Sequence, residues 1–270
     1  MIIIGEKING FIPKTLAAIE AQDAEYIKSL AADQAAAGAN FIDICAGVSS
    51  EKELDTMKWL IDLAQEASDL PLSLDSSSPA ILLEAMKFVN KPGIINSVSL
   101  EEEDGVSKCD LVFPVIADTD WKVVALSIDT SGIPESSAGK AEVAGRMIEK
   151  AAAAGIVQDR LYIDLVVTTL ATMQDSLLNF TSAIALVHEK YPEVHFTSGL
   201  SNISFGMPFR TAINRQFLAL TMAAGMDSAI MDPLSSDMQA TMYATAALLG
   251  QDEYCMEYLQ AYRAGRFGAK

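Results

Sequence analysis

The hydrophobic and polar positions of the chain repeat one arrangement eight times. A short apolar run, mostly β-branched, ends in a polar residue and is followed by a longer segment with helical spacing. Each such unit spans about 30 residues, the size of a strand joined to a helix. The runs that we expect to form strands are residues 2–4, 41–44, 72–75, 94–96, 123–128, 161–164, 194–199 and 228–231.

The segments between these runs predict helices. Gly155 and Gly225 each follow a helical stretch, and glycine is common just past a helix C-terminus. Pro79 suits the first turn of a helix. Residues 101–117 are ambiguous, because 112–116 have strand character while the acidic start is typical of a helix; we predict a helix there. The other expected helices are 23–37, 51–67, 79–89, 138–154, 174–190, 209–224, 236–249 and 253–263.

Eight strands that alternate with helices predict a (β/α)8 TIM barrel rather than an open doubly wound sheet. The chain has no Gly-x-Gly-x-x-Gly at the start of a helix, which a dinucleotide-binding sheet would need. The length of 270 residues suits one barrel, so we expect a single α/β domain over residues 1–270. Side chains at the carboxyl ends of barrel strands face a shared mouth. The residues at those ends are Glu6, Asn9, Asp43, Asp75, Asn96, Asp129, Asp164, Asn202 and Asp232.

Charge and composition exclude several functions. The net charge is −17, and the 19 Lys and Arg residues are scattered, which excludes nucleic acid as a partner. No apolar run is long enough to span a bilayer and the N-terminus lacks a basic signal-peptide region, so we expect a cytoplasmic protein. Cys45, Cys109 and Cys255 form no Cys-x-x-Cys pair, and we expect reduced thiols.

The predicted mouth is rich in carboxylates and amides, which narrows its chemistry. A Ser/His/Asp hydrolase needs a histidine, but His188 lies in a predicted helix and His195 early in a strand, so we expect both to be structural. No His-Glu-x-x-His or similar spacing is present, and we predict no metal site. Asp and Asn together suit a ligand with many N–H donors and ring acceptors, such as an aminopyrimidinone.

Residues 199–210 form a loop between the seventh predicted strand and a helix, where α/β proteins place reactive groups. Ser201 and Ser204 can donate and accept hydrogen bonds, and Asn202 carries an amide donor and a carbonyl acceptor. Taken alone, these residues are also typical helix N-caps. The polar residues at the other strand ends favour a ligand-binding role.

Five ordered motifs on five predicted strands carry a resemblance to a known family. They are Gly5-Glu6-Lys7-Ile8-Asn9-Gly10, Leu74-Asp75-Ser76, Ile95-Asn96-Ser97, Tyr162-Ile163-Asp164 and Gly199-Leu200-Ser201-Asn202-Ile203-Ser204-Phe205-Gly206. From residue 2 to about residue 249, the chain resembles pterin-binding methyltransferases. These enzymes move a methyl group between N5 of tetrahydrofolate and the cobalt of a corrinoid protein. The folate-binding module of cobalamin-dependent methionine synthase is a related group, and dihydropteroate synthase is a more distant one.

The resemblance implies a pterin-binding role for strand-end residues. Asp75, Asn96 and Asp164 would hold the pterin ring, and the Gly199 backbone and the Ser201 region would complete the pocket.

The resemblance also implies that Asn202 lies beside N5 as the catalytic residue. Its amide would donate a hydrogen bond as charge develops on that nitrogen, and no protein nucleophile would be required. The remaining substrate-binding residues that we expect at this mouth are Asp43, Arg210, Glu6 and Asn9.

The chain departs from the family pattern at three places. Cys45 stands where an Asn is common, Leu165 where a Pro commonly follows the Asp, and residues 205–209 are more polar in some members. These departures bear on the outer rim and on contacts to the glutamate tail of folate.

Tetrahydrofolate or methyltetrahydrofolate is the implied substrate, and the corrinoid (cobalamin) is expected on a separate partner protein. The chain has nothing like the Asp-x-His-x-x-Gly loop that ligates cobalt in corrinoid domains. Because family members are commonly homodimers, we expect a homodimer.

Three alternatives remain open. Dihydropteroate synthase is less favoured because the first strand lacks that family's Asn-x-x-x-Asp-Ser-Phe pattern. A non-catalytic folate-binding protein would keep Asp75 and Asn96 but need no donor at N5. A barrel enzyme acting on sugar phosphates would need a Gly-rich phosphate loop with basic support, which the sequence lacks.

Overall fold

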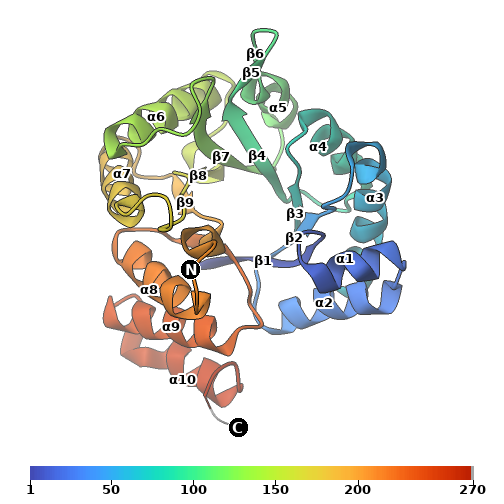
Figure 1. Ribbon diagram of the computed structural model, residues 1–270, viewed down its shortest axis with the longest axis vertical. Coiled ribbons are helices and arrows are strands. Elements are labelled where there is room, and N and C mark those ends of the chain that lie inside the picture. Colours follow the sequence, from blue (N-terminus) through green and yellow to red (C-terminus); the bar gives the residue numbers. More distant parts are fainter. Residues whose placement is uncertain (269–270) are drawn as a thin grey trace.

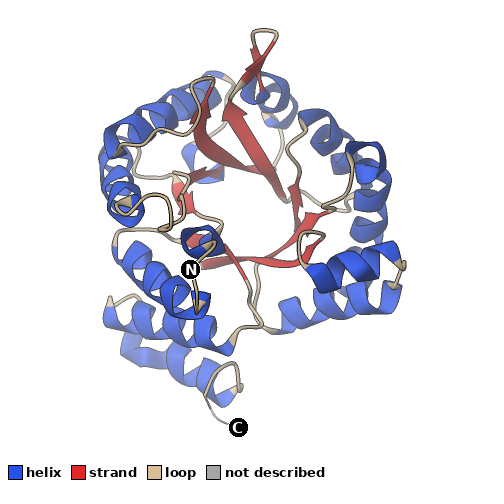
Figure 2. Ribbon diagram, in the orientation of Figure 1, coloured by secondary structure: helices blue, strands red, loops and turns tan. Residues whose placement is uncertain are grey.

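Eight parallel strands form a barrel whose outside is covered by helices (Figures 1 and 2). The structure is a computed structural model that describes residues 1–268. The strand order is β10-β1-β2-β3-β4-β7-β8-β9. The two ends of this sheet meet at a bridge between Gly199 and Ile230, where the Ile230 N–H donates to the Ser198 carbonyl at 3.0 Å. This bridge closes the predicted (β/α)8 barrel and confirms the predicted fold class.

All eight predicted strands are present. The strand that follows β8 is shorter than predicted, and Gly199 contributes only the closing bridge. The bounds are β1 (Ile2–Asn9), β2 (Phe41–Cys45), β3 (Leu72–Asp75), β4 (Ile94–Leu100), β7 (Lys122–Asp129), β8 (Leu161–Asp164), β9 (His195–Thr197) and β10 (Ser228–Met231).

The helices begin where the sequence offers caps. Ser78, Ser136 and Ser235 each accept a hydrogen bond from a backbone N–H of the following first turn. The α-helices are α1 (Pro13–Glu20), α2 (Ala24–Ala36), α3 (Ser50–Ala67), α4 (Pro79–Ala85), α5 (Lys108–Ile116), α6 (Ser137–Ala153), α7 (Ser176–Lys190), α8 (Arg210–Ala223), α9 (Ser236–Leu248) and α10 (Met256–Arg263). Short 3-10 turns occur at η1 (Met86–Phe88), η2 (Gln158–Arg160), η3 (Leu200–Ser204) and η4 (Glu253–Cys255).

The single helix predicted over residues 101–117 is wrong in its first half. A hairpin of β5 (Glu102–Glu103) and β6 (Val106–Ser107) precedes α5 and projects from the barrel at the top of Figure 1. Asp104 and Gly105 adopt positive φ angles that make its turn. Ser107 and Asp110 then form a capping box, which fixes the start of the helix at residue 108.

The barrel interior contains a small apolar cluster. It is formed by Ile4, Ile94, Val124 and Tyr162, with Ile2, Phe41, Leu126 and Ile230 packed against it. A much larger core lies between the strands and the helices, and it includes Ile42 and Ile44 of β2. Because side chains alternate along a strand, the neighbours of these outward residues point inward.

Candidate active site

A polar layer follows the apolar cluster inside the barrel. Two residues beyond an apolar interior position, and therefore on the same side of the chain, comes a polar residue on four strands and directly after a fifth, β10. These pairs are Ile4 and Glu6, Phe41 and Asp43, Ile94 and Asn96, Tyr162 and Asp164, and Ile230 and Asp232. On β3, Ser73 and Asp75 occupy the same face. The carboxyl end of the barrel thus holds a ring of acids and amides on an apolar floor.

Asp43 lies deepest among the acids and is 1% exposed. Its Oδ1 accepts hydrogen bonds from Ser73 Oγ at 2.6 Å and from Asn96 Nδ2 at 3.2 Å. Burial, reinforced by the charge of Asp75, raises the pKa of Asp43 well above its usual range despite these donors. Because the Asn96 side-chain nitrogen is engaged by Asp43, the side-chain oxygen is the atom that can accept a hydrogen bond from a ligand.

Asp75 pairs in register with Cys45 on one side and with Asn96 on the other. Burial raises the pKa of Asp75 to about 6, the hydrogen bond with the Cys45 thiol lowers it, and the charge of Glu53 raises it. Burial and the nearby carboxylates raise the pKa of the Cys45 thiol. Cys45 is therefore a neutral donor to Asp75, and Asp75 is mostly ionised at pH 7.

Asp164 lies across the ring and is also buried. Its Oδ1 accepts the Val166 N–H at 2.7 Å, and its carboxylate also bonds the Gly199 backbone. Burial raises the pKa of Asp164 to about 6, while these two bonds and then the charge of Lys140 act in the opposite direction. The Gly199 contact joins the strand β8 acid to the loop that carries Asn202.

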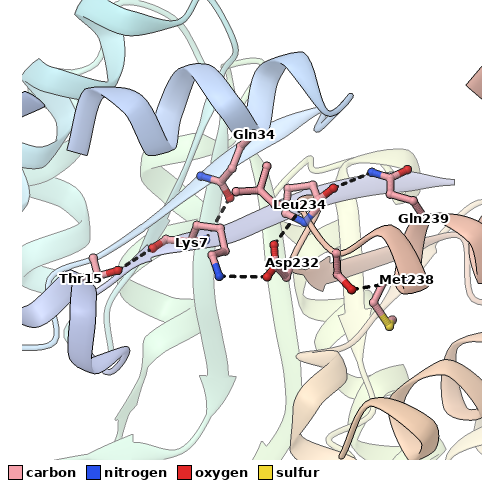
Figure 3. Close-up of polar contacts among 9 residues, drawn as sticks. Lys7, Thr15, Gln34, Asp232, Leu234, Met238 and Gln239 are labelled. Atoms are coloured by element: carbon pink, nitrogen blue, oxygen red, sulfur yellow. Dashed lines mark hydrogen bonds and ion pairs between the residues drawn. The ribbon is translucent and has the colours of Figure 1, made fainter. Parts of the chain in front are cut away.

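Glu6 and Asp232 extend the ring to β1 and the end of β10. Burial, followed by the charge of Asp232, raises the pKa of Glu6 to about 7, and Lys7 and Arg210 oppose the shift. The Lys7 ammonium lies 2.9 Å from Asp232 Oδ2 (Figure 3). A cavity of about 170 Å³ opens here, lined by Glu6, Leu200, Ser201, Thr211, Asn214, Met231, Asp232, Ser235 and Met238.

The loop after β9 is fixed by Arg210, at the start of α8. Its guanidinium donates to Ser204 Oγ at 3.0 Å and to the Ser201 carbonyl at 2.7 Å. Asn202 is exposed, and its side-chain nitrogen lies 2.9 Å from the point that a Cβ of residue 199 would occupy. The amide is therefore folded over Gly199, a position that a larger residue 199 would obstruct.

The structure brings most of the predicted site residues to this end of the barrel. Glu6, Asp43, Asp75, Asn96 and Asp164 are in the ring, and Gly199, Ser201, Asn202 and Arg210 belong to the loop beside it. Two strand-end residues have local partners instead. Asn9 accepts the Phe11 N–H at 2.8 Å within a turn, and Asp129 is paired with Arg146 of α6, which lowers its pKa.

Several contributors were not predicted from the sequence. Ser73 is detectable in hindsight, because it precedes Asp75 by two residues and must share its face. Lys7 is detectable only through its partner Asp232, which is 225 residues away. Lys140 and Asn214 lie on helices and carried no signal that linked them to the site.

Neither a metal-ligating cluster nor a membrane-spanning helix occurs among residues 1–268. This part of the chain contains no group of three His, Cys, Asp or Glu side chains placed to hold a metal ion. None of its helices has the length and apolar composition required to cross a membrane.

Comparison with known proteins gives matches over nearly the whole chain. Residues 14–232 match the family described as pterin binding enzyme. The methylcorrinoid:tetrahydrofolate methyltransferase of Eubacterium limosum is 46% identical over 270 residues, 99% of this chain and 98% of that protein. The methionine synthase of Mycobacterium tuberculosis is 32% identical over 240 residues, which are 86% of this chain but 20% of that protein.

Solved structures of dihydropteroate synthases share the fold. The enzyme from Xanthomonas albilineans in complex with 7,8-dihydropteroate superposes with a TM-score of 0.65 at 21% identity, over 92% of each chain. The Yersinia pestis enzyme with a pterine-sulfa conjugate gives a TM-score of 0.63 at 18% identity, over 92% of this chain and 94% of that chain. At such identity the likeness concerns the barrel alone.

Proposed function

The chain belongs to the pterin-binding enzyme family, and we propose that it transfers a methyl group between N5 of tetrahydrofolate and the cobalt of a separate corrinoid protein. The observation that carries this function is the 46% identity to a methylcorrinoid:tetrahydrofolate methyltransferase across nearly all of both chains. The family resemblance identified in the sequence is thereby confirmed. Dihydropteroate synthase is not favoured, because that likeness is limited to the fold.

The pterin ring is proposed to bind against Asp75, Asn96 and Asp164. Two of these side chains are carboxylates that are mostly ionised at pH 7, and a carboxylate can accept two parallel N–H bonds from an aminopyrimidinone. Each charge-assisted hydrogen bond contributes about 1.5–3 kcal/mol. The buried carbonyl oxygen of Asn96 adds an acceptor between them in the strand order.

Asn202 is proposed to assist the chemical step at N5. When the methyl group leaves N5, the bonding electron pair returns to that nitrogen, which takes up a proton from solvent to give tetrahydrofolate, and a positioned amide N–H stabilises the developing charge. The reduced cobalt of the partner supplies the nucleophile in this direction, so the chain itself needs none. In the reverse direction the N5 lone pair attacks the methyl group and N5 releases its proton to solvent, and the side-chain oxygen of Asn202 can accept the N5–H and so orient the lone pair.

The corrinoid partner is proposed to dock at the barrel mouth, since the cobalt must reach N5. Three phenylalanines support this location: Phe11, after β1, and Phe205 and Phe209, between β9 and α8, are 78%, 69% and 81% exposed. Exposed aromatic side chains are typical anchors of protein interfaces.

A homodimer is proposed through α7 and α8. A groove of about 460 Å³ runs between these helices and is lined by apolar side chains including Leu177, Leu178, Ile213 and Leu220. The same apolar face on a second copy would cover it. Leu178→Asp should therefore halve the mass measured by analytical ultracentrifugation, whereas a wild-type monomer would contradict the proposal. The expected location is the cytoplasm, a reducing compartment that suits the three free cysteines.

The function is tested by mixing the protein with methyltetrahydrofolate and free cobalamin reduced to the +1 state. Methyl transfer is expected to convert the spectrum of the reduced cobalt to that of methylcobalamin. Folate binding without transfer, even with an intact corrinoid partner, would instead indicate a non-catalytic folate-binding protein.

A further inference from the structure

A buried lysine on α6, in the outer ring of helices (Figure 1), contacts the backbone that follows β8. Lys140, in the first turn of α6, is 2% exposed, although lysine is almost never fully buried without partners. Its Nζ donates to the Leu165 carbonyl at 2.8 Å and to the Val166 carbonyl at 2.7 Å. Both acceptors of the Lys140 ammonium are therefore backbone carbonyl oxygens of one short segment.

That segment follows β8 and adopts an unusual conformation. Val166 has a φ of 50°, in the left-handed region that β-branched residues rarely adopt. In this conformation its N–H donates to Asp164 Oδ1 at 2.7 Å. The two bonds from Lys140 therefore hold the backbone in the arrangement that orients Asp164.

Lys140 also acts on the charge of Asp164. The ammonium favours the ionised carboxylate and so opposes the rise in pKa that burial causes. The register partners of this part of β8 are Leu126 on β7 and Thr197 on β9, which carry no charge. On the helix side, Lys140 is the charged group that faces the carboxylate.

We propose that Lys140 is a positioning residue for folate: its two bonds to the segment after β8 hold the Asp164 carboxylate in place without touching the ligand. This inference rests on the proposed function, in which Asp164 binds the pterin. It assigns to a residue outside the mouth a part of the affinity for substrate.

The test is the affinity for methyltetrahydrofolate of Lys140→Met, measured by calorimetry from pH 6 to pH 8. Removal of this opposite charge raises the pKa of the Asp164 carboxyl above its wild-type value of about 6, and loss of a neighbouring opposite charge typically raises a carboxyl pKa by about one unit or more. If only the ionised form binds, the ratio of variant to wild-type Kd should be about five times larger at pH 6 than at pH 8. The titration of the ligand cancels in this ratio.

A purely structural role would not produce this pH dependence. Met147→Ala, which truncates a buried apolar side chain on the same helix, should lower Tm but leave the Kd ratio constant across the pH range. Lys140→Arg keeps the charge and should keep the wild-type profile.

A pH-independent Kd ratio for Lys140→Met would overturn the inference. Lys140→Gln, which is neutral but still donates N–H groups, gives the same test should the Met variant not fold. Failure of the wild-type protein to bind methyltetrahydrofolate would contradict the proposed function instead, so the two failures are distinguishable.

Discussion

Asn202 is the residue on which the chemical step is expected to depend. Replacing it with Ala removes the donor that we propose at N5, and loss of one such positioned donor lowers a rate by about 10²–10³. Folate affinity should fall much less, because the pterin contacts remain. Single-turnover methyl transfer to reduced cobalamin measures the effect, and a wild-type rate would remove Asn202 from the mechanism.

Gly199 should matter for the same step without supplying any chemical group. A methyl side chain at 199 would lie 2.9 Å from Asn202 Nδ2, so Gly199→Ala must displace the amide. We expect its methyl-transfer rate to approach that of Asn202→Ala. The Gly199→Ala/Asn202→Ala double variant should then be no slower than Asn202→Ala alone, whereas additive losses would show that the two residues act separately.

Asp75 should control binding rather than the chemical step. Asp75→Ala removes the charge-assisted bonds that we propose to the pterin and should weaken folate affinity by about 10²-fold, as loss of two such bonds predicts. Asp129→Asn is a matched control, since this strand-end carboxylate already has Arg146 as its partner. Calorimetric titration should show near wild-type affinity for the control, and equal losses in both variants would contradict the assignment.

The ring of acids and amides was largely predictable, because alternation along a strand fixes which side chains face inward. The sequence alone does not show whether a strand-end residue faces a ligand or bonds to a neighbouring protein group. Asn9 and Asp129 illustrate this limit. Their partners, the Phe11 N–H and the Arg146 guanidinium, come close to them only once the backbone is folded.

At the scale of elements, the start of α8 combines exposure with backbone strain. Phe209 immediately precedes this helix with a φ of 47° and is 81% exposed, an arrangement that neither helix stability nor core packing explains. A left-handed conformation costs a non-Gly residue about 1 kcal/mol or more. This cost is consistent with a role of the aromatic ring in docking the corrinoid partner.

The variant Phe209→Gly separates the effect of backbone strain on stability from the role of the aromatic ring in docking. Relief of strain should offset the higher chain entropy of glycine, about 0.5–1 kcal/mol, so Tm should stay level or rise. Methyl transfer with the corrinoid protein should show a raised KM for that partner, because an exposed anchor is lost. Transfer with free cobalamin serves as the control and should be unchanged; an equal effect on both reactions would argue against docking.

Helices and strands were predicted correctly where a periodic apolar pattern extends over many residues. They were missed where a local contact determines the structure. The strands and long helices follow from their patterns, but the eight-residue helix α1 was not predicted. The acidic segment before α5 was predicted to be helical. The capping box between Ser107 and Asp110 instead starts the helix at residue 108, and the segment before it forms a hairpin.

At the scale of the whole molecule, the buried acids predict how stability depends on pH. Glu6, Asp75 and Asp164 have folded-state pKa values of about 6 to 7, above the ordinary values near 4. The folded protein therefore binds protons more tightly than the unfolded chain. Their stabilising contribution is full below about pH 4 and is lost as the pH rises through 6 to 7. The hydrogen bond that the His195 ring donates to the Asp227 carboxylate raises the pKa of His195 and acts in the same direction.

The Tm of the ligand-free protein should accordingly fall by several degrees between pH 5 and pH 8, since 1 kcal/mol corresponds to about 2–4 °C for a chain of this size. Scanning calorimetry measures this slope. Asp75→Asn removes one of the titrating groups and should flatten it. A Tm that rises over this interval would contradict the assignment of raised pKa values.

The bridge between Gly199 and Ile230 that closes the barrel lies in the same stretch of chain as the Asn202 loop. With β9 only three residues long, this seam has few ladder hydrogen bonds to resist local opening. A folate that contacts both Asp164 and Asn202 would hold the two sides of this seam together. Amide hydrogen exchange at Ile230 should therefore slow when substrate binds. Exchange at this position in the barrel wall then measures how much of the folate site is occupied.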